Sequence, residues 1–96
     1  MDEIEKPFPQ TFEIEITDSI DLHSFAPNEI RRVVEAYLDE ARMKGFQYVR
    51  IIHGKGIGVQ REIVRNLLRE KEFVKSFKSG DEFSGGSGAT VVELRN

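Results

Sequence analysis

Residues 48–58 read Tyr48-Val49-Arg50-Ile51-Ile52-His53-Gly54-Lys55-Gly56-Ile57-Gly58, and this stretch indicates the fold class. All but one of its first five residues are apolar, as expected of a strand in the middle of a sheet. A glycine-rich loop follows directly. The apolar residues after the loop recur at the spacing of a helix: Ile63, Val64, Leu67 and Leu68. A strand, a loop and a helix in this order indicate an α/β unit.

The segment before this strand repeats the arrangement. Residues 19–23 alternate between apolar and polar side chains, which predicts a strand. Pro27 suits the start of the next helix, because the N–H that proline lacks is not needed there. Gly45 is placed to end that helix. The buried stripe of the helix is predicted at Ile30, Val33, Val34, Tyr37, Leu38 and Ala41.

Two further strands are predicted at residues 73–77 and 90–94, on either side of a loop rich in glycine and serine. The order βαβαββ predicts a two-layer α/β sandwich, with a four-stranded mixed sheet and both helices on one face. Each crossover should be right-handed and join parallel strands, and the last pair should be antiparallel. Residues 18–96 are expected to form the domain, and residues 1–17 an N-terminal arm or extended lead-in.

The composition limits the class of protein. The chain has 96 residues, 14 basic and 17 acidic side chains, a net charge of −3 and no cysteine. This length supports one small domain, and the lack of cysteine excludes disulfides, thiolate metal sites and a thiol nucleophile. No apolar stretch approaches the ~20 residues of a membrane helix, and the acidic start is unlike a signal peptide. We therefore expect a soluble, cytoplasmic domain without membrane contact.

The net charge conceals an uneven distribution. Residues 1–40 contain eleven acidic and three basic side chains, a net of −8, whereas residues 41–96 contain six acidic and eleven basic ones, a net of +5. Such asymmetry is a hint about binding partners and not about the fold. The basic part includes the glycine loop, so nucleic acid is a candidate partner there.

Two histidines follow strands that are expected to be parallel. His23 ends the first strand and His53 the second, so both imidazoles should lie at the carboxyl edge of the sheet, where α/β proteins bind ligands. Asp21 shares a strand face with His23, and such a pair could hold a divalent metal, orient water or act as a general base. Alternatively, each histidine only caps its strand and bonds to the backbone.

The loop at residues 54–58 is a candidate phosphate site. Gly54, Gly56 and Gly58 let the backbone approach an anion, the start of the next helix favours negative charge, and Lys55 adds a positive charge. The loop matches neither a Walker A motif nor a dinucleotide fingerprint, so one phosphate of a polynucleotide fits better than a mononucleotide. A turn selected for tight packing is the alternative.

A stripe of arginines begins just after the loop. Arg61, Arg65 and Arg69 recur every four residues and could follow a phosphate backbone. The alternative is an ordinary solvated helix face, neutralised in part by Glu62 and Glu70.

The residues at these positions resemble the Smr (small MutS-related) domain family. The family's Asp-Leu-His segment corresponds to residues 20–23, and its His/Thr-Gly-x-Gly loop to residues 51–56. Residues 85–94 look like its glycine-rich loop and last strand, so the resemblance runs from about residue 18 to the end. Many members have glycine after Asp-Leu-His, whereas this chain has Ser24, which is similar to short, stand-alone bacterial members.

The resemblance implies binding to DNA or RNA in a structured or branched form, in a setting such as DNA repair or recombination. It also implies nicking endonuclease activity, which parts of the family have. In this hypothesis Asp21 and His23 activate water, with or without Mg²⁺ or Mn²⁺, and His53 protonates the leaving oxygen. Two alternatives remain: a non-catalytic module for branched or structured nucleic acid, and a protein-interaction domain that uses the acidic residues 1–40.

Overall fold

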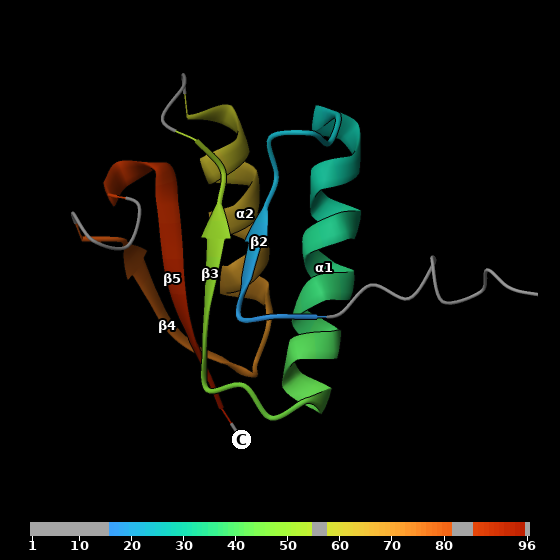
Figure 1. Cartoon of the computed structure of the whole chain (residues 1–96), viewed down its shortest axis with the longest axis vertical. Coiled ribbons are helices and arrows are strands. Elements are labelled where there is room, and N and C mark those ends of the chain that lie inside the picture. Colours follow the sequence, from blue (N-terminus) through green and yellow to red (C-terminus); the bar gives the residue numbers. More distant parts are fainter. Residues whose placement is uncertain (1–15, 55–57, 82–85, 96) are drawn as a thin grey trace, which may run out of the picture.

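The elements follow the predicted order along the chain (Figure 1). The computed structural model describes residues 16–54, 58–81 and 86–95. Residues 1–15 of the predicted arm (residues 1–17), Lys55 and Gly56 therefore lie outside the described residues. The elements are β2 (Ser19–Asp21), α1 (Pro27–Met43), β3 (Tyr48–Ile52), α2 (Val59–Glu70), β4 (Val74–Ser79), the short 3-10 helix η2 (Gly86–Gly88) and β5 (Ala89–Leu94).

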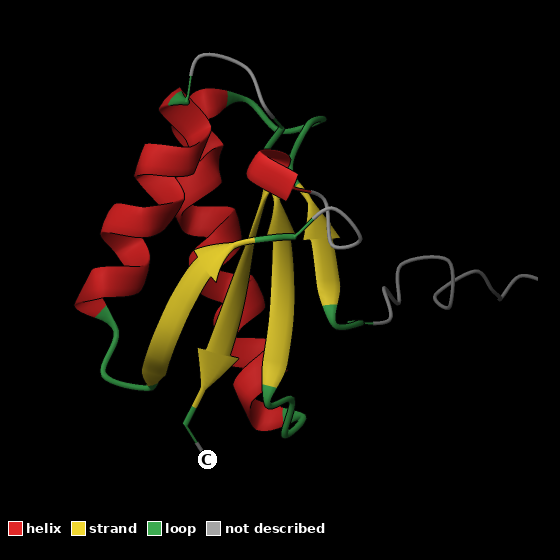
Figure 2. Ribbon diagram, turned by 90° about the vertical axis from the view of Figure 1, so that its left-hand side faces the viewer, coloured by secondary structure: helices red, strands yellow, loops and turns green. Residues whose placement is uncertain are grey.

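The four described strands form one mixed sheet in the order β2-β3-β5-β4. β2 pairs with β3 in parallel, and β5 pairs antiparallel with both β3 and β4. β4 therefore runs in the same direction as β3, as the α2 crossover predicts, but β5 lies between these two strands. Both helices cover one face of the sheet and leave the other face open (Figure 2). The predicted two-layer α/β sandwich is confirmed.

The first helix begins and ends where its sequence predicts. Pro27 occupies its first turn, and Gly45 just after it has a φ of 82°, in the left-handed region that favours glycine. The carboxylate of Glu29 accepts a hydrogen bond from the backbone N–H of Ala26 at 3.0 Å, so a negative group already occupies the start of α1. Neither helix of the described chain has the length and apolar composition needed to cross a membrane.

The core lies between the helices and the covered face of the sheet. Val49 and Ile51 of β3 point into it, as does Val92 of β5, while Tyr48 on the other face is 53% exposed. This alternation is typical of a sheet that is covered on one side only. The lead-in is held to the domain by Tyr37, whose hydroxyl donates to the carbonyl of Thr17 at 2.6 Å. Burial raises the pKa of Tyr37 to about 12.

Candidate functional site

The carboxyl ends of β2 and β3 lie side by side (Figure 1). The register pairs Asp21 with Ile52, and the N–H of Leu22 donates to the carbonyl of Ile52 at 2.8 Å. The residues that follow these strands are therefore neighbours. His23 and His53 lie at the same edge of the sheet, as the parallel arrangement predicts.

The two histidines nevertheless face different sides of that edge. Leu22 and His53 are buried, whereas Asp21 and His23 are exposed. Because side chains alternate along a strand, Asp21 points to the open face of the sheet and His53 points toward the helices. The sequence places both imidazoles at one edge but does not separate them by face.

Asp21 and His23 form a local pair. Oδ1 of Asp21 accepts a hydrogen bond from the backbone N–H of His23 at 3.0 Å and another from Nδ1 at 2.8 Å. A carboxylate only accepts, so Nδ1 carries the ring proton and Nε2 of the neutral imidazole is an acceptor. The hydrogen bond from the backbone N–H of His23 lowers the pKa of Asp21 most, and the bond from the ring lowers it further. The His23 side chain is 80% exposed, so the arrangement suits a base that is oriented by a carboxylate.

His53 is bonded on both sides of its ring. Nδ1 lies 3.0 Å from the carbonyl oxygen of Gly54 and must donate to it, so Nε2 accepts from the hydroxyl of Thr90 at 2.9 Å. Burial lowers the pKa of His53, and the nearby Arg61 and Arg65 lower it further. These contacts favour a neutral histidine that holds the surrounding backbone in place.

The turn before β5 supports the glycine loop. The carbonyl of Gly88 accepts hydrogen bonds from the N–H groups of His53 and Gly54, both at 2.9 Å. Thr90 and Gly88 are therefore site residues that the sequence reasoning missed. The run of glycines at residues 85–88 was the only signal for them, because their partners lie on another strand.

A cavity of about 390 Å³ opens between the starts of the two helices. Its lining consists of Pro27, His53, Gly54, Gly58, Val59, Gln60 and Arg61. Gly58 precedes α2 with a φ of 85°, and no side chain of the described residues caps this helix. Its first N–H groups can therefore bind an anion, whereas the carboxylate of Glu29 already binds the N–H of Ala26 just before α1.

The arginine stripe of α2 consists of Arg61, Arg65 and Arg69. Of the two glutamates expected to neutralise it, Glu70 forms an ion pair with Arg31 of α1 instead. Glu62 has no ion pair within the part of the chain that the structure describes. The stripe begins at the cavity, because Arg61 is part of the cavity lining.

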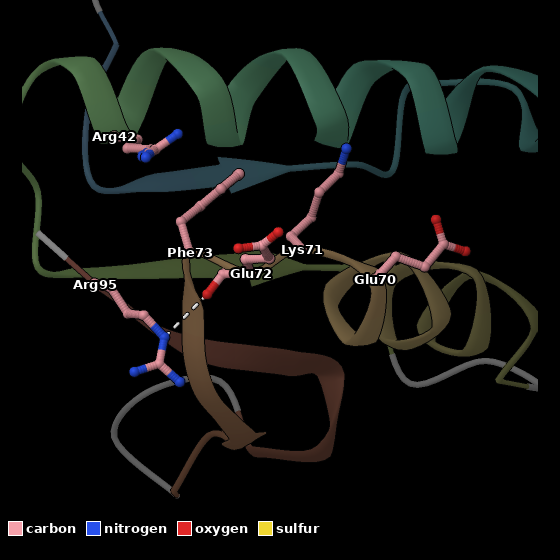
Figure 3. A pocket seen from close by; sticks show the side chains of 6 residues that line it. All are labelled: Arg42, Glu70, Lys71, Glu72, Phe73 and Arg95. Atoms are coloured by element: carbon pink, nitrogen blue, oxygen red, sulfur yellow. Dashed lines mark hydrogen bonds between the residues drawn. The ribbon is translucent and has the colours of Figure 1, made fainter.

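A larger cavity, of about 560 Å³, lies at the opposite end of α2 (Figure 3). The three cationic side chains that line it, Arg42, Lys71 and Arg95, already contact other groups of the protein. Lys71 is bonded to Glu35, which lowers the pKa of Glu35, and the guanidinium of Arg42 lies 4.7 Å from the centre of the Phe73 ring. Nε of Arg95 donates to the carbonyl of residue 72 at 2.9 Å. We therefore assign the site to the smaller cavity, where backbone donors are open.

Comparison with protein families gives a match to the Smr domain over residues 20–95. The chain is 45% identical over 78 residues to Endonuclease MutS2 of Caldicellulosiruptor bescii, which covers 81% of this chain and 10% of that protein. It is 42% identical over 80 residues to Endonuclease MutS2 of Clostridium acetobutylicum, covering 83% of this chain and again 10% of the relative. The chain thus spans about a tenth of these relatives.

Two solved structures have the same fold. The Smr domain of Thermus thermophilus MutS2 is 38% identical with a TM-score of 0.78, and the match covers 83% of this chain and 100% of that one. YdaL, a stand-alone small MutS-related protein from Escherichia coli, is 29% identical with a TM-score of 0.80. That match covers 91% of this chain and 71% of YdaL.

Proposed function

Because the chain belongs to the Smr domain family, we propose that it binds nucleic acid at the carboxyl edge of the sheet and nicks a phosphodiester bond there. The observation that carries this proposal is that the Asp21–His23 pair and the cavity at the start of α2 lie at the same edge of the sheet. The MutS2 relatives are named as endonucleases, which supports cleavage of a phosphodiester bond as the reaction.

One phosphate of the strand would occupy the cavity. The first N–H groups of α2 and Arg61 would bind its oxygens, and Lys55 and Gly56 of the same loop are proposed to complete the contact. Gly54 and Gly58 both have a φ of 85°, a backbone conformation that side chains rarely allow. A strand that crosses the edge of the sheet would then place its next phosphodiester near His23.

The hydrolytic step uses the Asp21–His23 pair. Nε2 of His23 takes a proton from water as the water oxygen attacks the phosphorus, and the Asp21 carboxylate stabilises the resulting imidazolium. The bond from phosphorus to the leaving oxygen breaks, and solvent protonates that oxygen. We assign His53 to holding the loop rather than to this protonation, because both of its ring nitrogens are bonded within the protein.

Mg²⁺ or Mn²⁺ would find one carboxylate ligand here, Asp21, because Nδ1 of His23 donates to that carboxylate and Nε2 must stay free to act as the base. No group of three or more metal-ligating side chains occurs among residues 16–54, 58–81 and 86–95, so Asp21 would share the ion with water and phosphate oxygens. A bound ion would supply charge stabilisation at the phosphoryl oxygens.

The sequence is compatible with two other functions. A non-catalytic module for branched or structured nucleic acid would use the same cavity and stripe without the step at His23. A protein-interaction role for the acidic residues 1–40 has less support, since Glu35 pairs with Lys71 and Glu29 binds the start of α1.

Nicking of supercoiled plasmid, with and without Mg²⁺ or Mn²⁺, tests the proposal. Wild type should nick the plasmid, whereas Asp21→Asn and His23→Ala should nick it about 10²–10⁴-fold more slowly. Binding of labelled branched and linear DNA and RNA, measured in parallel, should stay within about threefold because neither residue lines the cavity. Equal nicking by all three proteins would contradict the catalytic assignment, and binding without nicking by wild type would favour the non-catalytic module.

A further inference from the structure

Two arginines of α2 lie over one aromatic ring of β4. The guanidinium carbon of Arg65 is 5.5 Å from the centre of the Phe77 ring, and that of Arg69 is 5.7 Å from it. Nη2 of Arg65 also donates to the hydroxyl of Ser79 at 3.0 Å. We call these four residues the α2–β4 ridge.

The contacts of the ridge orient the guanidinium groups without neutralising them. Arg69 donates to the amide oxygen of Asn66 at 2.8 Å, which is a neutral acceptor like the hydroxyl that binds Arg65. Neither arginine has an ion pair within the described part of the chain. An arginine held against a ring loses less side-chain freedom when it binds phosphate, so the ridge is preorganised for an anion.

One donor of Arg65 is unused. Its Nε is buried and has no hydrogen-bond partner among the described residues. Nε and Nη2 lie on one edge of the guanidinium, and the exposed Ser79 hydroxyl pairs only with Nη2. A phosphate that displaced this hydroxyl would satisfy both donors, because two of its oxygens match the guanidinium fork.

The ridge continues from the cavity at the start of α2. Arg61 lines the cavity, and Arg65 and Arg69 follow at intervals of four residues. With a rise of about 1.5 Å per residue, the stripe extends about 12 Å along the helix. A stripe of this length can contact more than one phosphate of a single strand.

We propose that the α2–β4 ridge binds the sugar–phosphate backbone of one nucleic-acid strand and reads no base sequence. This inference rests on the nucleic-acid binding proposed above and names the contact that extends it. Two guanidinium groups already lie over Phe77, so the ring is a positioning residue for Arg65 and Arg69 and not a platform for bases.

A double-mutant cycle on binding tests the ridge. Affinity for labelled duplexes of two unrelated sequences is measured for wild type, Phe77→Leu, Arg65→Gln/Arg69→Gln and the triple variant. Phe77→Leu should weaken binding about three- to tenfold for both sequences. In the background without the two arginines, the same change should alter affinity less than about twofold, because the ring then has nothing to position.

Phe73→Leu is the matched control. Phe73 also lies under a guanidinium, that of Arg42 at 4.7 Å, but at the other end of α2 (Figure 3). Phe73→Leu should leave the affinity for both duplexes unchanged. Arg65→Lys is a second variant that keeps the charge and loses the planar fork, and it should also weaken binding, whereas Arg32→Lys on α1 should not.

The outcomes separate the two proposals. The ridge proposal would be overturned if Phe77→Leu reduced affinity equally with and without the two arginines. It would also be overturned if Arg65→Lys kept full affinity, or if Phe73→Leu reduced affinity as much as Phe77→Leu does. In each of these cases wild type still binds, so nucleic-acid binding itself stands. Absence of binding by wild type to every probe would overturn both proposals.

Discussion

The hydroxyl of Thr90 donates to Nε2 of His53 over 2.9 Å, although 37 positions separate the two residues in the chain. Together with the carbonyl of Gly88, which accepts from two N–H groups, this bond joins the loop after β3 to the turn before β5. The conformation at the start of the glycine loop therefore depends on a strand that follows much later in the sequence.

Removing the hydroxyl of Thr90 should destabilise the fold. Thr90→Val leaves Nε2 of the buried His53 without a donor, so the free energy of unfolding should fall by about 1–3 kcal/mol. Thr90→Ser retains the hydroxyl and is the control, with a loss of less than about 1 kcal/mol. Urea unfolding at neutral pH measures both, and equal stability of the valine and serine variants would show that the bond is unimportant.

Stability should depend on pH through His53. Burial lowers the pKa of His53 below its usual 6.5, so the unfolded chain binds this proton more readily than the folded chain does. The neutral His53 contributes its full share to the free energy of unfolding above about pH 6.5, the pKa of the unfolded chain. This share is lost as the pH falls from there toward the lower pKa of His53 in the folded chain.

The measurement is a thermal melt at about pH 7.5 and about pH 5.5, a window set by the histidine titration. The melting temperature of wild type should fall more than that of His53→Gln. Asp21 and Glu35 contribute little to this difference, because their pKa values are lowered from 3.8 and 4.5 and so lie below the window. Equal shifts in the two proteins would contradict the prediction.

Two glycines with the same backbone conformation should differ in function. Gly54 has a φ of 85° and Gly45 a φ of 82°, and no atom of the described residues lies within 4 Å of a Cβ added at either one. Gly54→Ala and Gly45→Ala should each cost roughly 1–2 kcal/mol of stability from the left-handed conformation. Only Gly54→Ala should also weaken nucleic-acid binding in an anisotropy titration, because Gly45 lies at the far end of α1; a similar loss of affinity in both would argue against the cavity.

The salt dependence of binding should identify the phosphate contact at the cavity. Arg61→Gln should reduce the slope of log K against log salt by about 0.9 on duplex DNA, as expected for one lost phosphate contact. Arg32 on α1, whose side chain is 80% exposed, is the matched control, and Arg32→Gln should leave the slope unchanged. Identical slopes for wild type and Arg61→Gln would remove this residue from the interface.

Much of the site could be predicted from local patterns. The helical stripe from Ile30 to Ala41 and the positive φ of Gly45 follow from neighbours within a few residues. The pairing of Asp21 with His23 is equally local, since it spans two positions. The placement of Lys55 and Gly56 in the phosphate contact stays a prediction, because both lie outside the described residues.

By itself, the sequence determined the βαβαββ order, the ends of α1 and the common edge of His23 and His53, because hydrophobic periodicity and turn chemistry act over a few residues. Only the tertiary structure decided that β5 lies between β3 and β4, that Thr90 binds His53 and that Arg65 lies over Phe77. Each of these contacts joins elements that are separated along the chain and that meet only when the sheet pairs and α2 packs on it. Short-range patterns carry no information about which distant partner a side chain will meet.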